Sequence, residues 1–389
     1  MSRLPPAVVL LAVTALAGCG DAERAGNASG TWERLPDPPL SAREAATAVA
    51  VGGEALILGG SDAPPCPPNA SCVAPGEPPL RDGAAFDPAA GTWERIASAP
   101  VGFSSAYTAV LGDALYLLIP GEKGRPDAPP AFLRYHRRAD RWKKLPLPPD
   151  AGGRWLVATD RQVVAYAESE EHDAVEDMAF DPATKEWSAL PDDPLPPTYG
   201  RTMAWSGREL VLFAAESVPQ PGAEKPSVLI AAAFDPRAGS WRRLPDSEIL
   251  GGGGRWFAHD GRMILPARGG ADGGETGNWG RTYPNGGILD LDQNRWLPLP
   301  DGPDGDEDFS AGTVAGERAD VFAQGDWILD AVGGDWIAVP PLDERGGEVL
   351  VSGRALVAAG RDVVAFGGAR STRDGNLELL ADAWTWSIP

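Results

Sequence analysis

Four arginines occupy equivalent places along the sequence and could together bind an anion. Arg43, Arg154, Arg201 and Arg255 each stand at the start of an expected innermost β-strand. A guanidinium presents a planar fork of N–H donors that matches the two oxygens of a carboxylate. If these strands converge on one opening, the side chains predict a site for a carboxylate or an acidic peptide. The alternative interpretation is that each arginine pairs with an acidic loop residue and ties neighbouring structural units together.

Aromatic residues accompany the arginines and could stack on sugar rings. Side chains alternate along a strand, so about half of these rings should face the interior, and roughly two or three should remain accessible. The ligand-binding candidates among them are Trp279 and Tyr283, which share one long loop. The other aromatic residues in these places are Phe103, Tyr107, Trp155, Tyr199, Trp205 and Trp256.

The candidate metal ligands do not make up a complete set. Asp304, Asp306 and Asp308 offer the alternating carboxylates that calcium favours, but the distal glutamate of an EF-hand loop is missing. Either a calcium site or a solvated acidic loop fits these three residues. Cys66 and Cys72 have no histidine nearby, which would leave a zinc site half empty. We therefore expect no metal and no cofactor.

The N-terminus predicts export and a lipid anchor. Arg3 precedes an apolar run over residues 7–16, which is too short to cross a bilayer and is typical of an export signal. The run ends in a Leu-Ala-Gly-Cys sequence that resembles the bacterial lipobox. This resemblance implies cleavage after residues 1–18 and lipidation of Cys19. The alternative is an ordinary secretory signal in which the cysteine is a coincidence.

The expected location is therefore the bacterial cell envelope, outside the cytoplasm and attached to the membrane through Cys19. Two acyl chains suffice for stable anchoring. Residues 19–30 are expected to form a flexible tether between the anchor and the folded domain. In an exported chain, Cys66 and Cys72 are expected to form a local disulfide.

The charge of the chain narrows the choice of partners. The sequence has 34 Lys and Arg against 55 Asp and Glu, a net charge of −21. Neutralising nucleic-acid phosphates requires a clustered excess of basic residues, so we expect no nucleic acid, and anionic membrane surfaces are disfavoured as well. The acidity indicates either solubility outside the cell or attraction of cations or basic partners.

A repeated tryptophan signature defines the elements that position these residues. Each copy has a tryptophan, an aliphatic residue three positions later and, in six of the seven copies, a proline directly after it. A period of 40 to 61 residues indicates stacked copies of one supersecondary unit, none of which buries its apolar face alone. The tryptophans are Trp32, Trp93, Trp142, Trp187, Trp241, Trp296 and Trp336.

An aspartate six residues before the tryptophan is a second fixed point of the repeat. An apolar run leads into the aspartate, a short turn follows, and the tryptophan opens the next strand. We interpret these aspartates as structural, because their carboxylates can accept hydrogen bonds from turn amides. A second hairpin with a tight turn precedes them, so each unit has four strands. The aspartates are Asp87, Asp181, Asp235, Asp290 and Asp330.

Two glycine doublets, Gly59-Gly60 and Gly367-Gly368, complete a pattern that resembles the kelch repeat of β-propellers. The resemblance covers residues 31–389 and is divergent, since other copies lack the doublet. It extends to the propellers like the central domain of galactose oxidase. It implies an all-β, seven-bladed kelch-like propeller. Six blades are complete from Arg43 onward, and the seventh is expected to close by pairing residues 31–36 with residues 383–387 of the C-terminal blade.

Loop lengths single out one face of such a propeller. We call it the loop-rich face: the loops between second and third strands and the connections between blades open there, whereas the remaining short turns form the short-turn face. Long loops on a rigid scaffold commonly carry binding sites; drift at a surface without function is the alternative. The insertions span residues 61–81, 120–131, 168–177, 216–227, 266–287 and 369–379. The sequence thus predicts a protein that binds a protein, peptide or glycan at this face.

The resemblance also implies an enzymatic alternative. Kelch-like propellers include a sialic-acid mutarotase, and an enzyme of the mutarotase or epimerase type could act on an acidic sugar at the channel mouth with the four arginines and Glu44. They also include a copper radical oxidase, but His136, His172 and His259 are too few and two are expected on the short-turn face. No nucleophile–base pair stands out by spacing, so we assign no catalytic residue and favour a binding module.

Overall fold

The computed structural model describes residues 30–66, 78–104, 106–121, 129–170, 176–217, 225–250, 254–273, 281–302, 313–315, 327–331, 334–340, 342, 351–372 and 376–388. Within these residues the chain is all-β, as the sequence predicts, apart from one turn of 3-10 helix at Arg137–Ala139. None of the described helices is long and apolar enough to span a membrane.

Antiparallel four-stranded sheets dominate the described part of the fold, and five of them take their strands in chain order. The first has β2 (Thr47–Val51), β3 (Glu54–Leu58), β4 (Gly83–Asp87) and β5 (Thr92–Ile96). The second has β6 (Tyr107–Leu111), β7 (Ala114–Ile119), β8 (Ala131–His136) and β9 (Arg141–Leu145). The third has β10 (Arg154–Ala158), β11 (Val163–Ala167), β12 (Met178–Asp181) and β13 (Glu186–Ala189).

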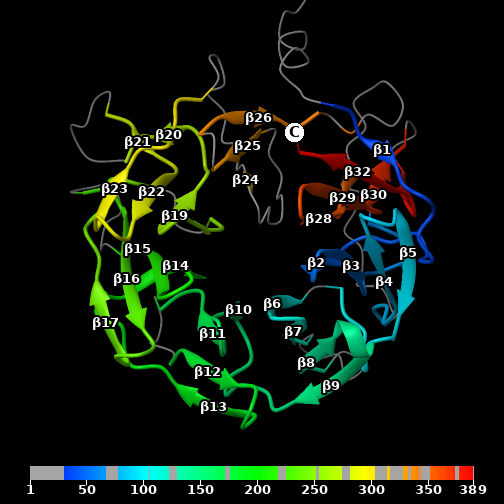
Figure 1. Ribbon diagram of the computed structural model, residues 1–389, viewed down its shortest axis with the longest axis horizontal. Helices are drawn as coiled ribbons and strands as arrows, with labels where there is room; N and C mark the ends of the chain where they lie inside the picture. Colours follow the sequence, from blue (N-terminus) through cyan, green and yellow to red (C-terminus); the bar gives the residue numbers. More distant parts are fainter. Residues whose placement is uncertain are drawn as a thin grey trace, which may run out of the picture.

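Two further sheets continue this order. The fourth has β14 (Thr198–Trp205), β15 (Leu210–Glu216), β16 (Leu229–Asp235) and β17 (Ser240–Arg243), and the fifth has β18 (Phe257–His259), β19 (Arg262–Leu265), β22 (Gly287–Asp290) and β23 (Arg295–Leu297). Figure 1 shows these sheets one after another around a common centre, with β2, β6, β10 and β14 innermost and β5, β9, β13 and β17 at the rim. The fold is therefore β-propeller-like.

The last sheet joins the two ends of the described chain. It contains β28 (Ala355–Ala359), β29 (Asp362–Phe366), β32 (Ala383–Ser387) and, as its outer strand, β1 (Glu33–Arg34). Glu33 pairs with Thr385 and Arg34 with Trp384, so the pairing predicted between residues 31–36 and 383–387 is present. In Figure 1, β1 lies beside β32.

One stretch differs from the predicted repeat. Among the described residues, β24 (Thr313–Ala315), β25 (Trp327–Asp330) and β26 (Trp336–Ala338) form a three-stranded sheet in which β24 runs parallel to β25. The sequence predicts an antiparallel four-stranded unit here. Two small sheets add to the long loops: β20 (Gly270–Ala271) pairs with β21 (Tyr283–Pro284), and β30 (Ala369–Ser371) pairs with β27 (Val351–Ser352) and β31 (Leu377–Leu379).

The repeated tryptophans link each unit to the one before it. In six copies the indole Nε1 donates to a main-chain carbonyl four residues after the preceding tryptophan. In five of these copies the carbonyl belongs to the proline of the repeat signature. This contact explains why tryptophan and proline recur together. The pairs are Trp142 with Ala97 (2.7 Å), Trp187 with Pro146 (2.8 Å), Trp241 with Pro191 (2.8 Å), Trp296 with Pro245 (2.7 Å), Trp336 with Pro300 (3.1 Å) and Trp32 with Pro340 (2.7 Å).

The aspartates of the repeat hold the turns between third and fourth strands, as predicted. The Asp87 carboxylate accepts from the backbone N–H of Ala89 at 2.8 Å, and Asp181 and Asp235 make the same contact two residues ahead. Each turn ends in a residue with positive φ, such as Gly91 (φ 65°). Because glycine adopts this conformation without strain, it suits this place in the turn.

The glycine doublets bring neighbouring inner strands close together. Gly367 and Gly368 have φ of 64° and 101°, and the Gly368 N–H donates to the Arg43 carbonyl at 2.9 Å. A Cβ atom on Gly367 would come within 2.6 Å of that carbonyl. The doublet therefore allows the last sheet to contact the start of the first, and Gly60 contacts Phe103 in the same way.

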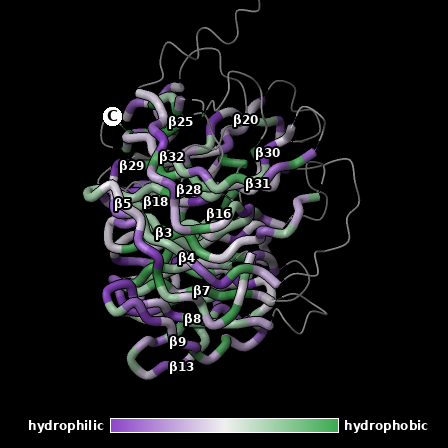
Figure 2. Tube along the Cα trace, turned by 90° about the vertical axis from the view of Figure 1, so that its right-hand side faces the viewer, coloured by the Kyte–Doolittle hydropathy of each residue, from purple (hydrophilic) through white to green (hydrophobic). Residues whose placement is uncertain are grey.

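Apolar clusters between adjacent sheets form the core. The second strands are largely buried, as predicted: all six residues of β7 and all five of β11 are buried. Leu56 and Leu58 pack with Leu115 and Leu117 between the first two sheets, and equivalent clusters follow between later sheets. Figure 2 shows hydrophobic residues along the strands. This rigid stack fixes the positions of the inner strands.

Candidate functional site

The starts of the inner strands and the ends of the second strands lie at the loop-rich face. The connections between second and third strands are the long ones, such as that from β3 to β4, whereas the turns from first to second strands are short. Arg154, the first residue of β10, pairs with Ala167, the last residue of β11. Side chains from these two places can therefore meet at one edge of each sheet.

Arg43 uses all five of its N–H donors within the protein. Its Nε and one Nη2 hydrogen bond go to the Ser41 carbonyl and hydroxyl, at 3.0 and 2.8 Å. Its remaining hydrogen bonds go to the Gly59 carbonyl at 3.0 Å and to both carboxylate oxygens of Asp82, at 2.7 and 3.2 Å. Burial alone would raise the pKa of Asp82, but the contacts with Arg43 lower it. Only 1% of Arg43 is exposed, so it binds loops together.

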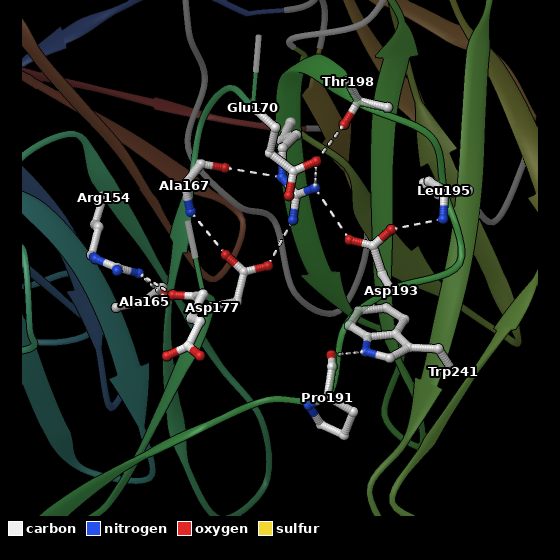
Figure 3. Close-up of polar contacts among 12 residues, drawn as sticks. Arg154, Ala165, Ala167, Glu170, Asp177, Pro191, Asp193, Leu195, Thr198 and Trp241 are labelled. Atoms are coloured by element: carbon white, nitrogen blue, oxygen red, sulfur yellow. Dashed lines mark hydrogen bonds and ion pairs between the residues drawn. The ribbon is translucent and has the colours of Figure 1, made fainter. Parts of the chain in front are cut away.

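Arg201 lies among three carboxylates between the third and fourth sheets. Its guanidinium is 2.7 Å from Glu170, 2.7 Å from Asp177 and 3.2 Å from Asp193, and its Nε donates to the Ala167 carbonyl at 3.2 Å. In Figure 3, the carboxylates of Glu170, Asp177 and Asp193 approach one centre from three directions. We call these four charged residues the Arg201 cluster. The cluster joins β14 to the loops beside β11, β12 and β13.

The Arg201 cluster has more carboxylates than cations, and the pKa values reflect this. Burial raises the pKa of Asp177 and of Glu170, and the neighbouring carboxylates add to the effect, while Arg201 opposes it. Burial would lower the pKa of Arg201, but its three carboxylates together raise it. Arg201 is therefore firmly charged, and the raised pKa values mean that Glu170 and Asp177 hold protons more tightly than they would in water.

We predict that the Arg201 cluster makes stability depend on pH. The folded-state pKa of Glu170 is raised, so the folded protein binds this proton more tightly than the unfolded chain does. The resulting contribution to the free energy of unfolding is fully present below the ordinary carboxyl pKa of about 4, and it is lost as pH rises through the raised folded-state pKa. Glu170→Gln should therefore flatten the rise in stability on acidification from neutral pH, as measured by urea unfolding at a series of pH values. The exposed Glu248 provides the control, Glu248→Gln. Identical pH dependence of Glu170→Gln and the wild type would contradict this.

The other two arginines differ from these. Arg154, only 2% exposed, donates to the carbonyls of Asp150, Ala165 and Glu176 at 2.8, 3.3 and 2.8 Å, and burial lowers its pKa. Arg255 is exposed, with its guanidinium carbon 5.5 Å from the centre of the Phe257 ring. This geometry favours the interpretation that Arg43, Arg154 and Arg201 tie structural units together. Ligand binding by the four arginines stays a prediction.

Sequence reasoning missed another arginine of this kind. Arg268 is 8% exposed, and its guanidinium carbon lies 5.4 Å from the Trp327 ring and 5.3 Å from the Trp336 ring. It thereby links the fifth sheet's loop to β25 and β26. Arg268 follows the second strand rather than starting the first, so no repeat position could have identified it.

Three of the predicted aromatic residues are buried in the interior. Phe103, Trp256 and Tyr283 are 2%, 5% and 3% exposed, and the Arg281 guanidinium lies 4.4 Å from the centre of the Tyr283 ring. The Tyr199 hydroxyl is 2.8 Å from the Ser227 hydroxyl. Trp279, the other ligand-binding candidate, lies outside the described residues. Tyr283 thus contributes to packing, and a ligand-binding role for the two stays a prediction.

Tyr107 and Trp155 instead form an exposed aromatic surface, which we call the Tyr107–Trp155 platform. Tyr107 starts β6 and Trp155 is the second residue of β10, on the innermost strands of neighbouring sheets. Their ring centres are 4.7 Å apart with an interplanar angle of 46°. The Trp155 side chain is 41% exposed, more than any other large hydrophobic residue in the described part of the chain. Its Nε1 donates to Glu168 at 3.3 Å, which orients the indole.

A separate pocket of about 580 Å³ lies at the C-terminal sheet. Its charged side chains are largely paired with one another, since Arg34 is 3.0 Å from Asp37 and Arg370 is 2.8 Å from Glu378. It is lined by Arg34, Asp37, Pro38, Leu40, Ala42, Arg370, Glu378, Leu379, Leu380, Ala381, Asp382 and Trp384. The platform, with its exposed ring, is the stronger candidate for a ligand site.

Several predicted residues fall outside the described part of the chain. Cys66 is disulfide-bonded, whereas Cys72, its expected partner, lies outside the described residues. So do Cys19 with the export signal, and the acidic residues Asp304, Asp306 and Asp308. The described residues contain no group of three His, Cys, Asp or Glu side chains placed to hold a metal.

Comparison with known proteins adds no relative. The sequence matches no protein-family model. No curated protein is significantly similar to it. Inference about function therefore depends on the geometry described above.

Proposed function

We propose that this protein is a lipid-anchored binding module of the bacterial cell envelope. In this proposal its seven-bladed kelch-like β-propeller takes a protein, peptide or glycan at the loop-rich face, and Cys19 attaches it to the membrane. The tether of residues 19–30 would reach up to roughly 40 Å when extended. This is long enough to hold the domain clear of the lipid headgroups.

Two sets of contacts support closure into a ring of seven blades. β1 completes the C-terminal sheet. The N-terminal strand that has no blade of its own in the sequence therefore supplies the fourth strand of the C-terminal blade. The indole hydrogen bonds follow the same cyclic order: Trp32 donates to Pro340, and the tryptophans from Trp142 onward each donate to a carbonyl of the preceding repeat. A closed ring leaves no sheet edge exposed, so no strand is open to pairing with another chain, which suits a protein outside the cytoplasm.

The observation that carries the binding proposal is the exposure of Trp155. A tryptophan buries a large apolar area on contact, so an indole that is 41% exposed on an inner strand offers a ligand a large contact surface. The Tyr107 ring and the Glu168 carboxylate hold it in place. A rigid aromatic ring beside polar groups is the usual composition of a recognition site.

Replacing Trp155 with alanine should abolish or weaken ligand binding by about tenfold or more, because stacking on an indole is lost. The measurement is a mixed glycan and peptide array, probed with the wild type and with Trp155→Ala. Leu147 is the matched control, since it is 39% exposed and lies in the connection that leads to β10. If no array signal depends on Trp155, or if Leu147→Ala reduces the same signals equally, the platform is not the binding site.

A further inference from the structure

We propose that the Tyr107–Trp155 platform takes an arginine side chain of a basic peptide segment, an inference that rests on the proposed binding function. The guanidinium would stack on the exposed face of Trp155 and donate to Glu168 at the edge of the ring. This names the ligand chemistry of the site: a planar cation carried by a peptide, rather than an anion or a neutral sugar.

The shape of the platform suits a guanidinium. Trp155 offers a wide ring face, and tryptophan is the best aromatic partner for a cation. Glu168 lies at the indole edge, where its Oε2 accepts from the ring Nε1 at 3.3 Å. A guanidinium lying flat on the ring keeps its N–H donors in its own plane, directed outward to such an edge carboxylate. A compact ammonium has no plane to stack and gains less from this arrangement.

The chain repeatedly uses this contact within its own fold. Arginine guanidinium carbons lie 4.4 to 5.5 Å from the ring centres of Tyr283, Trp336, Trp327 and Phe257. No arginine or lysine of the described residues lies over Tyr107 or Trp155. The platform is thus an exposed aromatic surface of the same kind, on which a guanidinium could come from another molecule.

The accessible charges around the platform are negative. Glu168 is exposed, and its Oε1 makes no hydrogen bond within the described structure. Asp150 and Glu176 are also exposed, and their backbone carbonyls both contact Arg154, which places them beside the start of β10. None of these three carboxylates forms an ion pair with any described residue. A cation stacked on Trp155 therefore meets the Glu168 carboxylate, and two further exposed carboxylates lie near the start of the same strand.

The nearby basic groups do not compensate for these carboxylates. Arg154 is 2% exposed and Arg201 is 3% exposed, and both already donate to groups within the protein. The carboxylates would therefore repel an anionic ligand, and neither Arg154 nor Arg201 is accessible to bind it. The net charge of −21 adds a long-range field that attracts basic segments and speeds their association.

The test measures binding of four fluorescent probes to the full-length chain in detergent. The probes are a glycine–arginine alternating decapeptide, the lysine and glutamate versions of the same peptide, and a neutral N-acetylglucosamine oligosaccharide. We expect the arginine peptide to bind most tightly, Trp155→Ala to weaken it about tenfold, and Glu168→Gln to weaken it about threefold. Leu147→Ala should leave it unchanged. Thermal unfolding confirms that the variants fold, which is expected because both side chains are exposed.

The other outcomes separate this inference from the proposed function. If the glutamate peptide or the oligosaccharide binds in a Trp155-dependent manner and the arginine peptide does not, the site exists but its ligand chemistry is different. Equal binding of the arginine and lysine peptides, both insensitive to Trp155→Ala, would show general attraction to an acidic protein and overturn the inference. If Trp155→Ala changes neither the binding of any of the four probes nor any array signal, the proposed function is overturned as well.

Discussion

Replacing Arg201 with methionine should lower the free energy of unfolding by about 3–5 kcal/mol, the cost of leaving buried charges without their partner. The side chain is almost wholly buried, and three carboxylates converge on it. Without the guanidinium, Glu170, Asp177 and Asp193 would repel one another in a poorly solvated place. The measurement is urea unfolding near neutral pH.

Arg208→Met is the matched control for Arg201→Met. Arg208 contacts Asp292 at 2.7 Å, but the two side chains are 53% and 64% exposed. Solvent-exposed pairs of this kind contribute about 0–1 kcal/mol. Combining Arg201→Met with Glu170→Gln and Asp177→Asn should recover part of the lost stability, because it removes the repulsion. A loss below about 1 kcal/mol for Arg201→Met alone would show that the cluster is not a structural tie.

Removing β1 should produce the second large effect. A chain that starts at residue 37 loses the outer strand of the C-terminal sheet, the hydrogen bond from Trp32 to Pro340, and the contact of Trp32 with Trp386 at 6.2 Å between ring centres. We expect a fall in melting temperature of roughly 5 °C or more and concentration-dependent aggregation, because β32 becomes an open edge. A chain that starts at residue 30 keeps β1 and is the control. Equal melting temperatures of the two chains would contradict closure.

A pair of conservative substitutions tests the same contact with less disturbance. Trp32→Phe removes the indole donor to Pro340 and should cost about 1 kcal/mol. Trp93 is the equivalent residue of another repeat, but its buried Nε1 has no hydrogen-bond partner among the residues that the structure describes. Trp93→Phe should therefore cost less than Trp32→Phe, or even stabilise the fold. The opposite order in urea unfolding would show that the indole hydrogen bonds do not link the units.

The fold could be predicted because its determinants recur at fixed spacing. Six of the seven tryptophans donate to a carbonyl of the preceding repeat, and aspartates such as Asp181 accept from an amide two residues ahead, so both leave a periodic trace in the sequence. The pairing of β1 with β32 followed from counting the strands left over at each end. The parallel pairing of β24 with β25 left no such trace, since a short apolar segment suits either direction.

The candidate site could be predicted only in part, because its determinants lie in loops. The sequence placed Arg154 correctly at the start of an inner strand, whereas Arg43 precedes β2 by four residues and Arg201 is the fourth residue of β14. Their carboxylate partners Asp82, Asp177 and Asp193 come from connections of irregular length, so spacing could not show that the guanidiniums were already used. The sequence placed Trp155 and Tyr107 among the aromatic residues near the arginines but singled out Trp279 and Tyr283 instead. The exposure of Trp155 depends on how closely two inner strands approach, which alternation alone does not determine.

The pairing of β1 with β32 also determines how an anchored molecule would be presented. As the outer strand of its sheet, β1 runs from the short-turn face toward the loop-rich face, so residue 30 lies at the short-turn end. The Ile388 N–H donates to the Arg361 carbonyl in the turn between β28 and β29, which places the C-terminal end there too. A chain held at Cys19 would therefore stand with its short turns toward the lipid. Trp155 would face outward, where a partner from outside the membrane arrives first.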